Sequence, residues 1–407
     1  VSSVSLCHQL QYVKLMKFLH QQGFTSKLLQ PSFFTGPGQL LISLPESCLL
    51  TTSSVLDSHL GHYIKSLMPH PSPVLVLCVF LMYERHRGEA SDWFPYIDLL
   101  PATYTCPVFF TDEVLAVLPT TVWRQALEQR EALREIYSSN QDFFRSLQPI
   151  LSQPVEEVFS YDALRWAWCS VNTRSVYMSN PSSNFLCGKD VYALAPFLDL
   201  LNHHPHVKVK ASFNDVTRCY EIRSVSGTLC YQQAFINYGS HDNQQLLLEY
   251  GFVAPCNPHS VVYVDKGELD DRSLEQKIKF LKENNFLDNL TMSKEGPSWR
   301  LMTALRLLSV PQTLYHQWKA VLLGQAVSEK REEWSIQTAK TLCLRLLQDT
   351  QSALDKISHL LQQCDQSVRE QLNLAKSLRN EERYILQKIC GQEIPVMTGH
   401  FKNLLFL

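Results

Sequence analysis

The sequence lacks a strong charge bias and any apolar run of transmembrane length. Its 37 Lys and Arg residues nearly balance its 39 Asp and Glu residues, for a net charge of -2. A protein that held nucleic acid through phosphate contacts would carry an excess of positive charge, so we expect no direct nucleic-acid binding. The longest apolar stretch, residues 73–83, is too short to span a bilayer, and we expect no membrane association.

The cysteines also lack the spacing of a structural zinc site. Twelve are scattered along the chain and none forms a C-x-x-C pair. We interpret them as reduced thiols and expect a cytoplasmic and nuclear protein. The cluster of His203, His204 and His206 has no acidic or cysteine partner at suitable spacing, so we predict no metal.

The length of 407 residues exceeds one ordinary core and predicts two or three domains. Helical periodicity dominates the N-terminal half, interrupted by one buried strand within 40–50, and returns after about residue 265. Between them the period changes to alternation, which predicts a β-hairpin over 207–213 and 219–225. A third strand is expected to end at Tyr238. A long helix is predicted over 159–178.

Two short segments break the local rules of the chain. Asn202 and His203 end a mostly apolar run, and Tyr-Gly occurs twice, at Tyr238-Gly239 and Tyr250-Gly251. Polar turn residues and buried aromatic side chains account for each feature taken alone. A second interpretation is that the Asn-His segment binds a ligand, and that both phenols line one narrow channel.

The combination resembles a known family. Asn-His, then a strand ending in Tyr-Gly, then a helix ending in Glu-Tyr-Gly-Phe, is similar to SET-domain methyltransferases of the Rubisco large-subunit lysine methyltransferase class. WFPYIDLLP, FSYDALRWAWCSVNTR and WRLMTALRLL support the resemblance. It implies an α+β fold with a SET domain of short strands that is split by a helical insertion, followed by an all-helical substrate-binding domain. The implied bounds are 1–27 for an N-terminal helix, 28–255 for the SET domain, about 54–178 for the insertion and 256–407 for the helical domain.

The resemblance further implies methyl transfer from S-adenosyl-L-methionine to a lysine of a protein substrate, either a histone or a non-histone protein. No metal is needed, since a sulfonium is already an activated leaving group and the protein's task is alignment. Tyr238 is implied as the catalytic tyrosine, and Tyr220 and Tyr250 as walls of the lysine channel. The residues implied to hold the cofactor are Asn202, His203, Arg174 and Tyr238.

Two alternatives stay open at this point. Related enzymes of this architecture methylate protein histidine. The chain also passes directly from FFTG to PGQLLISLPES, without the Gly-Arg-Gly-Leu segment that wraps the cofactor in SET domains. Pro37 offers no N–H donor there. A catalytically inactive SET-like interaction module is therefore the second alternative.

Overall fold

The computed structural model describes residues 9–25, 38–225, 233–265, 275–311, 314 and 317–391. The chain divides into two compact units. Unit 1 comprises Val1–Cys106, Glu128–Ser240 and Glu249–Gly251, and unit 2 comprises Pro107–Leu127, His241–Leu248 and Phe252–Leu407. Two helices, α7 (Thr120–Ser139) and α11 (Asn243–Tyr250), each have residues in both units. The predicted domain bounds, including the cut at 255/256, stay predictions.

Unit 1 is rich in helices, and one of them accounts for the longest apolar stretch. Helix α4 (Pro73–Arg87) starts after Ser72, whose side chain accepts a hydrogen bond from the backbone N–H of Leu75, and it has Pro73 at its first position. Every residue of α4 from Leu75 to Glu84 is buried, so the apolar character of this helix reflects its position in the core. The other helices of the unit are α1 (Leu10–Gln21), α2 (Thr52–Leu56), α3 (Gly61–Lys65), α5 (Phe94–Ile97), α8 (Gln141–Ser146), α9 (Val155–Val158) and α10 (Tyr161–Arg174).

The predicted hairpin is present in unit 1. Strands β5 (Val209–Asn214) and β6 (Cys219–Ser224) pair antiparallel, and β1 (Leu40–Pro45) pairs antiparallel with β6 to complete a three-stranded sheet. The long helix predicted over 159–178 is too long, because Ser175 turns to extended backbone (ψ 142°). Residues Ser175–Tyr177 form β2, which pairs with β3 (Tyr192–Leu194).

The third predicted strand ends earlier than expected, at Ile236 instead of Tyr238. Its described part is β7 (Phe235–Ile236), which runs parallel to β4 (Asn202–His203). The rest of that prediction, residues 229–232, lies outside the described residues.

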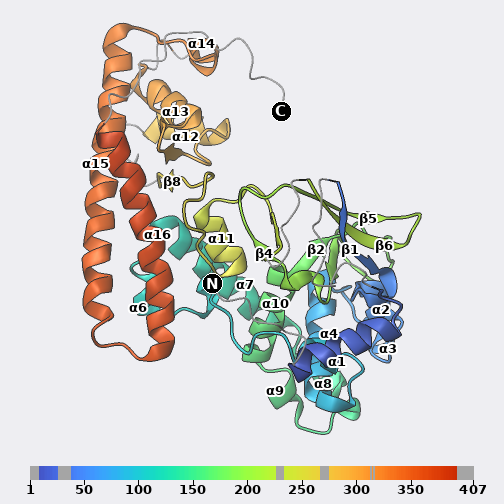
Figure 1. Cartoon of the computed structure of the whole chain (residues 1–407). Helices are drawn as coiled ribbons and strands as arrows, with labels where there is room; N and C mark the ends of the chain where they lie inside the picture. The colour runs from blue at the N-terminus through green and yellow to red at the C-terminus, as the bar shows by residue number, and fades with distance from the viewer. Residues whose placement is uncertain are drawn as a thin grey trace. The chain divides into compact units, whose positions relative to one another are not determined.

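Unit 2 is mainly helical. Helices α15 (Glu329–Leu360) and α16 (Gln366–Cys390) run side by side, as the orange and red ribbons of Figure 1 show. Contrary to the expectation of an all-helical domain, a short antiparallel sheet is present, in the order β10 (Gly296–Pro297), β9 (Thr291–Ser293), β8 (Val262–Tyr263). Its Val262 and Met292 are buried in the same apolar core as α13. The remaining helices are α6 (Asp112–Leu115), α12 (Glu275–Glu283), α13 (Trp299–Ser309) and α14 (Trp318–Leu322).

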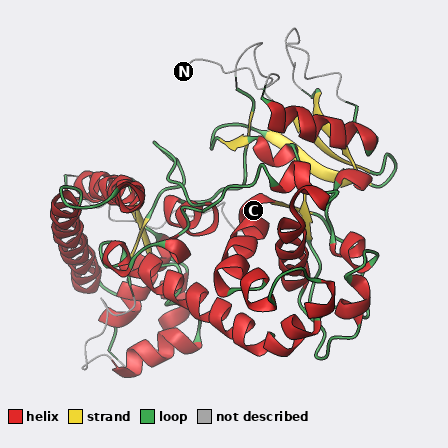
Figure 2. Ribbon diagram, turned by 90° about the horizontal axis from the view of Figure 1, so that it is seen from below, coloured by secondary structure: helices red, strands yellow, loops and turns green. Residues whose placement is uncertain are grey.

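The α+β class is confirmed: helices predominate and the strands are short (Figure 2). Over the ranges that the structure describes, no helix combines the length and the apolar character needed to cross a membrane.

Candidate active site

A short parallel strand pair brings the two unusual polar and aromatic segments together. Asn202 of β4 faces Phe235 of β7, and His203 faces Ile236. The backbone N–H of His204 extends this pairing with a hydrogen bond of 2.9 Å to the carbonyl of Ile236. The Asn-His segment therefore lies directly beside the strand that leads into Tyr238.

Hydrogen bonds at both ends fix the direction of Tyr238. Its backbone N–H donates to Nδ1 of His203 at 3.1 Å, and its phenol O–H donates to the carbonyl of Leu201 at 2.7 Å. The rings of His203 and Tyr238 lie 5.2 Å apart. Since Nδ1 of His203 accepts this bond, the neutral imidazole carries its proton on Nε2. Tyr238 is thus held by the side chain of His203 and by the backbone carbonyl of Leu201, the residue before Asn202.

A sharp turn follows Tyr238. Gly239 has φ +144°, and its N–H donates to the side-chain oxygen of Asn237 at 2.9 Å. The amide group of Asn237 donates to the carbonyl of Pro205 at 3.2 Å. These hydrogen bonds therefore hold the turn against the loop that follows the Asn-His segment.

The second Tyr-Gly places a second phenol beside the first. Tyr250 ends α11, and its ring centroid lies 5.0 Å from that of Tyr238, with 40° between the ring planes. Gly251 then takes φ +76°, which stops the helix, and its carbonyl accepts a 2.6 Å hydrogen bond from the hydroxyl of Thr105. Tyr238 and Tyr250, the tyrosines of the two Tyr-Gly pairs, are thus adjacent.

Both phenols are held in the neutral form at ordinary pH. Burial is the main cause that raises the pKa of Tyr238 to about 12; Arg174 lowers this pKa, while Asp199 and Tyr250 raise it. Burial also raises the pKa of Tyr250, with a further contribution from Glu249. The two tyrosines therefore present uncharged aromatic walls.

An ion pair lies next to this cluster, and only one of its members was predicted. Nη1 of Arg174, at the end of α10, lies 3.3 Å from both Oδ2 and the carbonyl oxygen of Asp199. The Asp199 side chain is 2% exposed, and Oδ2 also accepts a 2.9 Å hydrogen bond from the phenol of Tyr96. Burial raises the pKa of the Asp199 carboxyl, whereas Arg174 and Tyr96 lower it. The available sequence signal for Asp199 was a carboxylate within an apolar run.

The remaining predicted residues occupy different surroundings. Tyr220 is buried in β6, opposite Leu44 of β1 and Phe213 of β5, so the three-stranded sheet fixes it. Asn202 is exposed and His203 half-buried. The roles of these residues in binding cofactor or lysine stay predictions.

The buried ion pair offers a donor and an acceptor that suit a zwitterionic group. Within the described residues, Nε of Arg174 and Oδ1 of Asp199 are buried without a hydrogen-bond partner. Leaving such groups unsatisfied is costly. The methionine end of S-adenosylmethionine carries a carboxylate and an ammonium group, which complement this donor and this acceptor. The residues at this site therefore fit the predicted cofactor.

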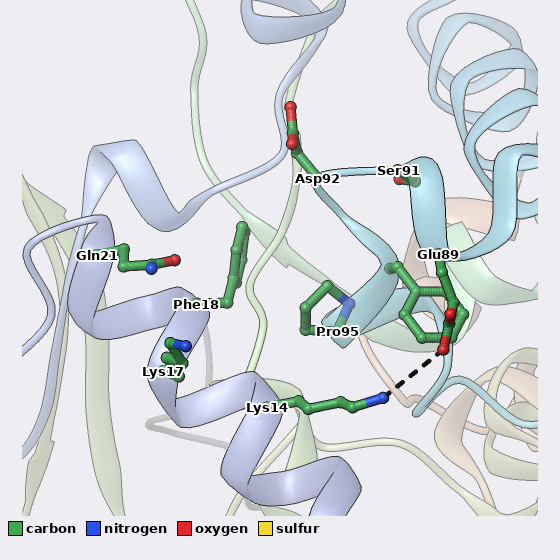
Figure 3. A pocket seen from close by; sticks show the side chains of 9 residues that line it. Lys14, Lys17, Phe18, Gln21, Glu89, Ser91, Asp92 and Pro95 are labelled. Atoms are coloured by element: carbon green, nitrogen blue, oxygen red, sulfur yellow. Dashed lines mark ion pairs between the residues drawn. The ribbon is translucent and has the colours of Figure 1, made fainter.

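A pocket of about 410 Å³ also opens in unit 1, between α1 and residues 89–95 (Figure 3). Lys14 bridges it, with Nζ 3.9 Å from the carboxylate of Glu89 and 5.5 Å from the ring centroid of Phe94. None of the residues predicted to hold cofactor or lysine lines this pocket. The residues that line this pocket therefore differ from those of the cluster formed by Tyr238 and Tyr250.

Sequence comparison decides the family. Human (Homo sapiens) SET domain-containing protein 4 is 44% identical over 403 residues, which cover 94% of this chain and 91% of the human protein. This chain belongs to the SET-domain methyltransferase family. S-adenosylmethionine is the cofactor of that family. Residues 268–386 also match the family described as Rubisco LSMT substrate-binding.

Solved structures of the same SET-domain class show the same fold. The crystal structure of the SET domain of LSMT bound to lysine and AdoHcy aligns with a TM-score of 0.65 and 18% identity, over 94% of this chain and 91% of that chain. More distant relatives differ in the residue that their names give as the target. The Schizosaccharomyces pombe ribosomal lysine N-methyltransferase set10 is 31% identical over 56% of this chain and 39% of its own length. The Drosophila melanogaster actin-histidine N-methyltransferase is 27% identical over 61% of this chain and 48% of its own length.

Proposed function

We propose that this SET-domain protein is a protein-lysine N-methyltransferase with Tyr238 as its catalytic tyrosine. The observation that carries the proposal is the pairing of Tyr238 with Tyr250, whose ring centroids lie 5.0 Å apart. Two adjacent phenols on a strand end and a helix end are suited to forming two walls of a narrow channel for an unbranched side chain.

The electrostatics of these walls suit an amine nucleophile. A lysine has an ordinary pKa of about 10.4, and it must lose its proton before it can accept a methyl group. A phenolate beside it would hold the ammonium form, but the raised pKa values of Tyr238 and Tyr250 keep both phenols neutral. Their faces attract the methylated cation after transfer. The cofactor supplies a methyl group on a sulfonium, and the channel residues supply alignment and the exclusion of water.

The substrate is proposed to be a protein, with histones and non-histone proteins as the two groups to test. Relatives named for ribosomal and actin substrates support a protein acceptor in general. The match of residues 268–386 to a substrate-binding family supports the assignment of acceptor binding to the segment 256–407. We propose that the protein acts in the cytoplasm and the nucleus.

Histidine is the second candidate target, because one relative is named for it. An inactive interaction module is the third reading, and it rests on the missing Gly-Arg-Gly-Leu segment. That segment would fall at residues 26–37, outside the described residues. Just after it, the N–H of Gly38 donates to the carbonyl of Ser224 at 2.6 Å, so the chain rejoins the sheet there.

Radiolabelled S-adenosylmethionine incubated with cell extract, core histones and actin tests these readings. Acid hydrolysis of the labelled protein then distinguishes methyllysine from methylhistidine. We expect methyllysine, strong loss of transfer in Tyr238→Phe, and little change in the control Tyr137→Phe, whose ring packs on Phe144 and Tyr161. Methylhistidine would favour the second candidate. A folded protein that neither binds S-adenosylmethionine nor labels any protein would favour the interaction module.

A further inference from the structure

The phenol of Tyr238 depends on one carbonyl, and that carbonyl follows a strained turn. Tyr238 donates its O–H to the carbonyl of Leu201 at 2.7 Å. Leu201 follows the short helix η6 (Leu198–Leu200), which begins after Phe197 at φ +73°. Bulky residues rarely adopt a positive φ, and such a conformation persists only where the surroundings hold it.

The surroundings that hold η6 come from the insertion. Asp199 lies in the middle of η6, and its Oδ2 accepts a 2.9 Å hydrogen bond from the phenol of Tyr96 on α5. Tyr96 itself is 2% exposed, so its phenol has little freedom to point elsewhere. Arg174 holds the same carboxylate and the carbonyl of Asp199, at 3.3 Å in both cases.

These contacts form one continuous path from the WFPYIDLLP motif to the catalytic phenol. It runs from Tyr96 to Asp199, through η6 to Leu201, and then to Tyr238. The sequence motif had no role of its own beyond supporting the family resemblance. The path gives its tyrosine a role, since Tyr96 is the member of the motif that donates to the carboxylate.

We propose that Tyr96 is a positioning residue that sets the orientation of the Tyr238 phenol through Asp199 and the carbonyl of Leu201. The inference rests on the proposed role of Tyr238 in methyl transfer. It assigns to the helical insertion a part in alignment at the reacting centre. Tyr96 does not touch the reacting atoms in this proposal, and its effect passes through η6.

The proposal is tested by NMR on protein labelled with ¹³C at the Cζ of tyrosine, which requires neither a methyl acceptor nor the cofactor. The Tyr238 resonance is the one lost in Tyr238→Phe. We expect Tyr96→Phe to move this resonance. Tyr83→Phe is the matched control, because Tyr83 is also a buried tyrosine of the insertion and its ring packs on His59 at 4.7 Å. The control should leave the Tyr238 resonance in place.

A combined variant tests the route. A hydrogen bond to a carboxylate is about twice as strong as one to a neutral group, so Tyr96→Phe should move the resonance at most about half as far in an Asp199→Asn background. A full shift in that background would show that Tyr96 acts by another route and would overturn the proposal. An unmoved Tyr238 resonance in folded Tyr96→Phe would overturn it as well.

Methyl transfer supplies the functional measurement. If the hydrogen bond from Tyr96 to the Asp199 carboxylate aligns the Tyr238 phenol, the loss of this bond in Tyr96→Phe should lower kcat about tenfold while KM for the cofactor changes little. Equal loss in Tyr83→Phe would indicate a general structural effect and would overturn the positioning role. If the unaltered protein transfers no methyl group at all, the proposed function fails, and the resonance measurement still decides whether Tyr96 orients Tyr238.

Discussion

Replacing Gly251 with alanine tests whether the second Tyr-Gly is needed to place Tyr250. Gly251 directly follows Tyr250 and has φ +76°. A Cβ at this position would lie 2.8 Å from the hydroxyl oxygen of Thr105, 2.9 Å from its carbonyl carbon and 3.0 Å from the backbone nitrogen of Cys106. Two of these three atoms belong to the backbone, so rotation of a side chain cannot relieve the overlap.

Two terms contribute to the expected destabilisation. A left-handed conformation costs an alanine about 1–2 kcal/mol. Overlap with well-packed neighbours typically costs about 1–3 kcal/mol more. Gly251→Ala should therefore lower the free energy of unfolding by about 2–5 kcal/mol, and should displace the 2.6 Å hydrogen bond between the Thr105 hydroxyl and the Gly251 carbonyl.

Gly188→Ala is the matched control. Gly188 has φ +84°, but no atom lies within 4 Å of the Cβ that it would acquire. Gly188→Ala therefore has only the cost of the left-handed conformation, about 1–2 kcal/mol. The difference between the two variants isolates the overlap at Thr105 and Cys106.

Thermal unfolding of both variants is the assay, followed by measurement of methyl transfer. We expect the Tm of Gly251→Ala to fall roughly 5 °C further than that of Gly188→Ala, from the usual 2–4 °C per kcal/mol for domains of this size. Transfer should fall only in Gly251→Ala, because only that variant moves the residue after Tyr250. Equal Tm shifts together with equal transfer rates would refute the argument that this turn places the phenol.

Three further predictions concern charge and capping. Glu332→Ala should destabilise unit 2 by about 3–5 kcal/mol in denaturant unfolding, because the Arg306 guanidinium, which now lies 2.6 Å and 2.7 Å from the two Glu332 carboxylate oxygens, would stay buried without a partner. The double variant Arg306→Met/Glu332→Leu should lose much less stability, and an equal loss in both would contradict this reasoning. Folding raises the pKa of Tyr238 to about 12, so the folded state binds the phenol proton more tightly than the unfolded state does, and the free energy of unfolding should fall as pH rises from about 10 towards 12. Tyr238→Phe should lose less stability over this pH range, and identical pH profiles for the two proteins would contradict the prediction. Ser160→Ala should cost about 1 kcal/mol in unfolding measurements, because the hydroxyl caps α10 by accepting from the N–H of Ala163, and replacement by Asp should restore most of the loss.

Local sequence rules predicted the features that depend on neighbouring residues. The alternation of 207–213 and 219–225 predicted the β5–β6 hairpin. Both Tyr-Gly turns could be predicted because glycine takes a positive φ at little cost. These are short-range effects, and the sequence contains the whole cause of each.

Features that depend on distant partners were mispredicted or missed. The β4–β7 pair joins two strands of two residues each, too short for alternation to show, and the third strand was assigned no parallel partner. The helix over 159–178 was extended beyond Arg174 because its apolar period continues. Arg174 is held by Asp199, which is 25 residues away, and that contact has no local signal.

Asp199 shows what kind of sequence feature deserved more weight. A carboxylate within an apolar run is unfavourable unless a charged or hydrogen-bonding partner is supplied. Arg174 and Tyr96 supply it here, from α10 and α5. Places where a sequence breaks its own local pattern tend to be functional, because the cost must be offset elsewhere. By that argument, the lone aspartate before Asn202 pointed to the site as strongly as the Asn-His pair did, and the tyrosine of the WFPYIDLLP motif could have been sought as its donor.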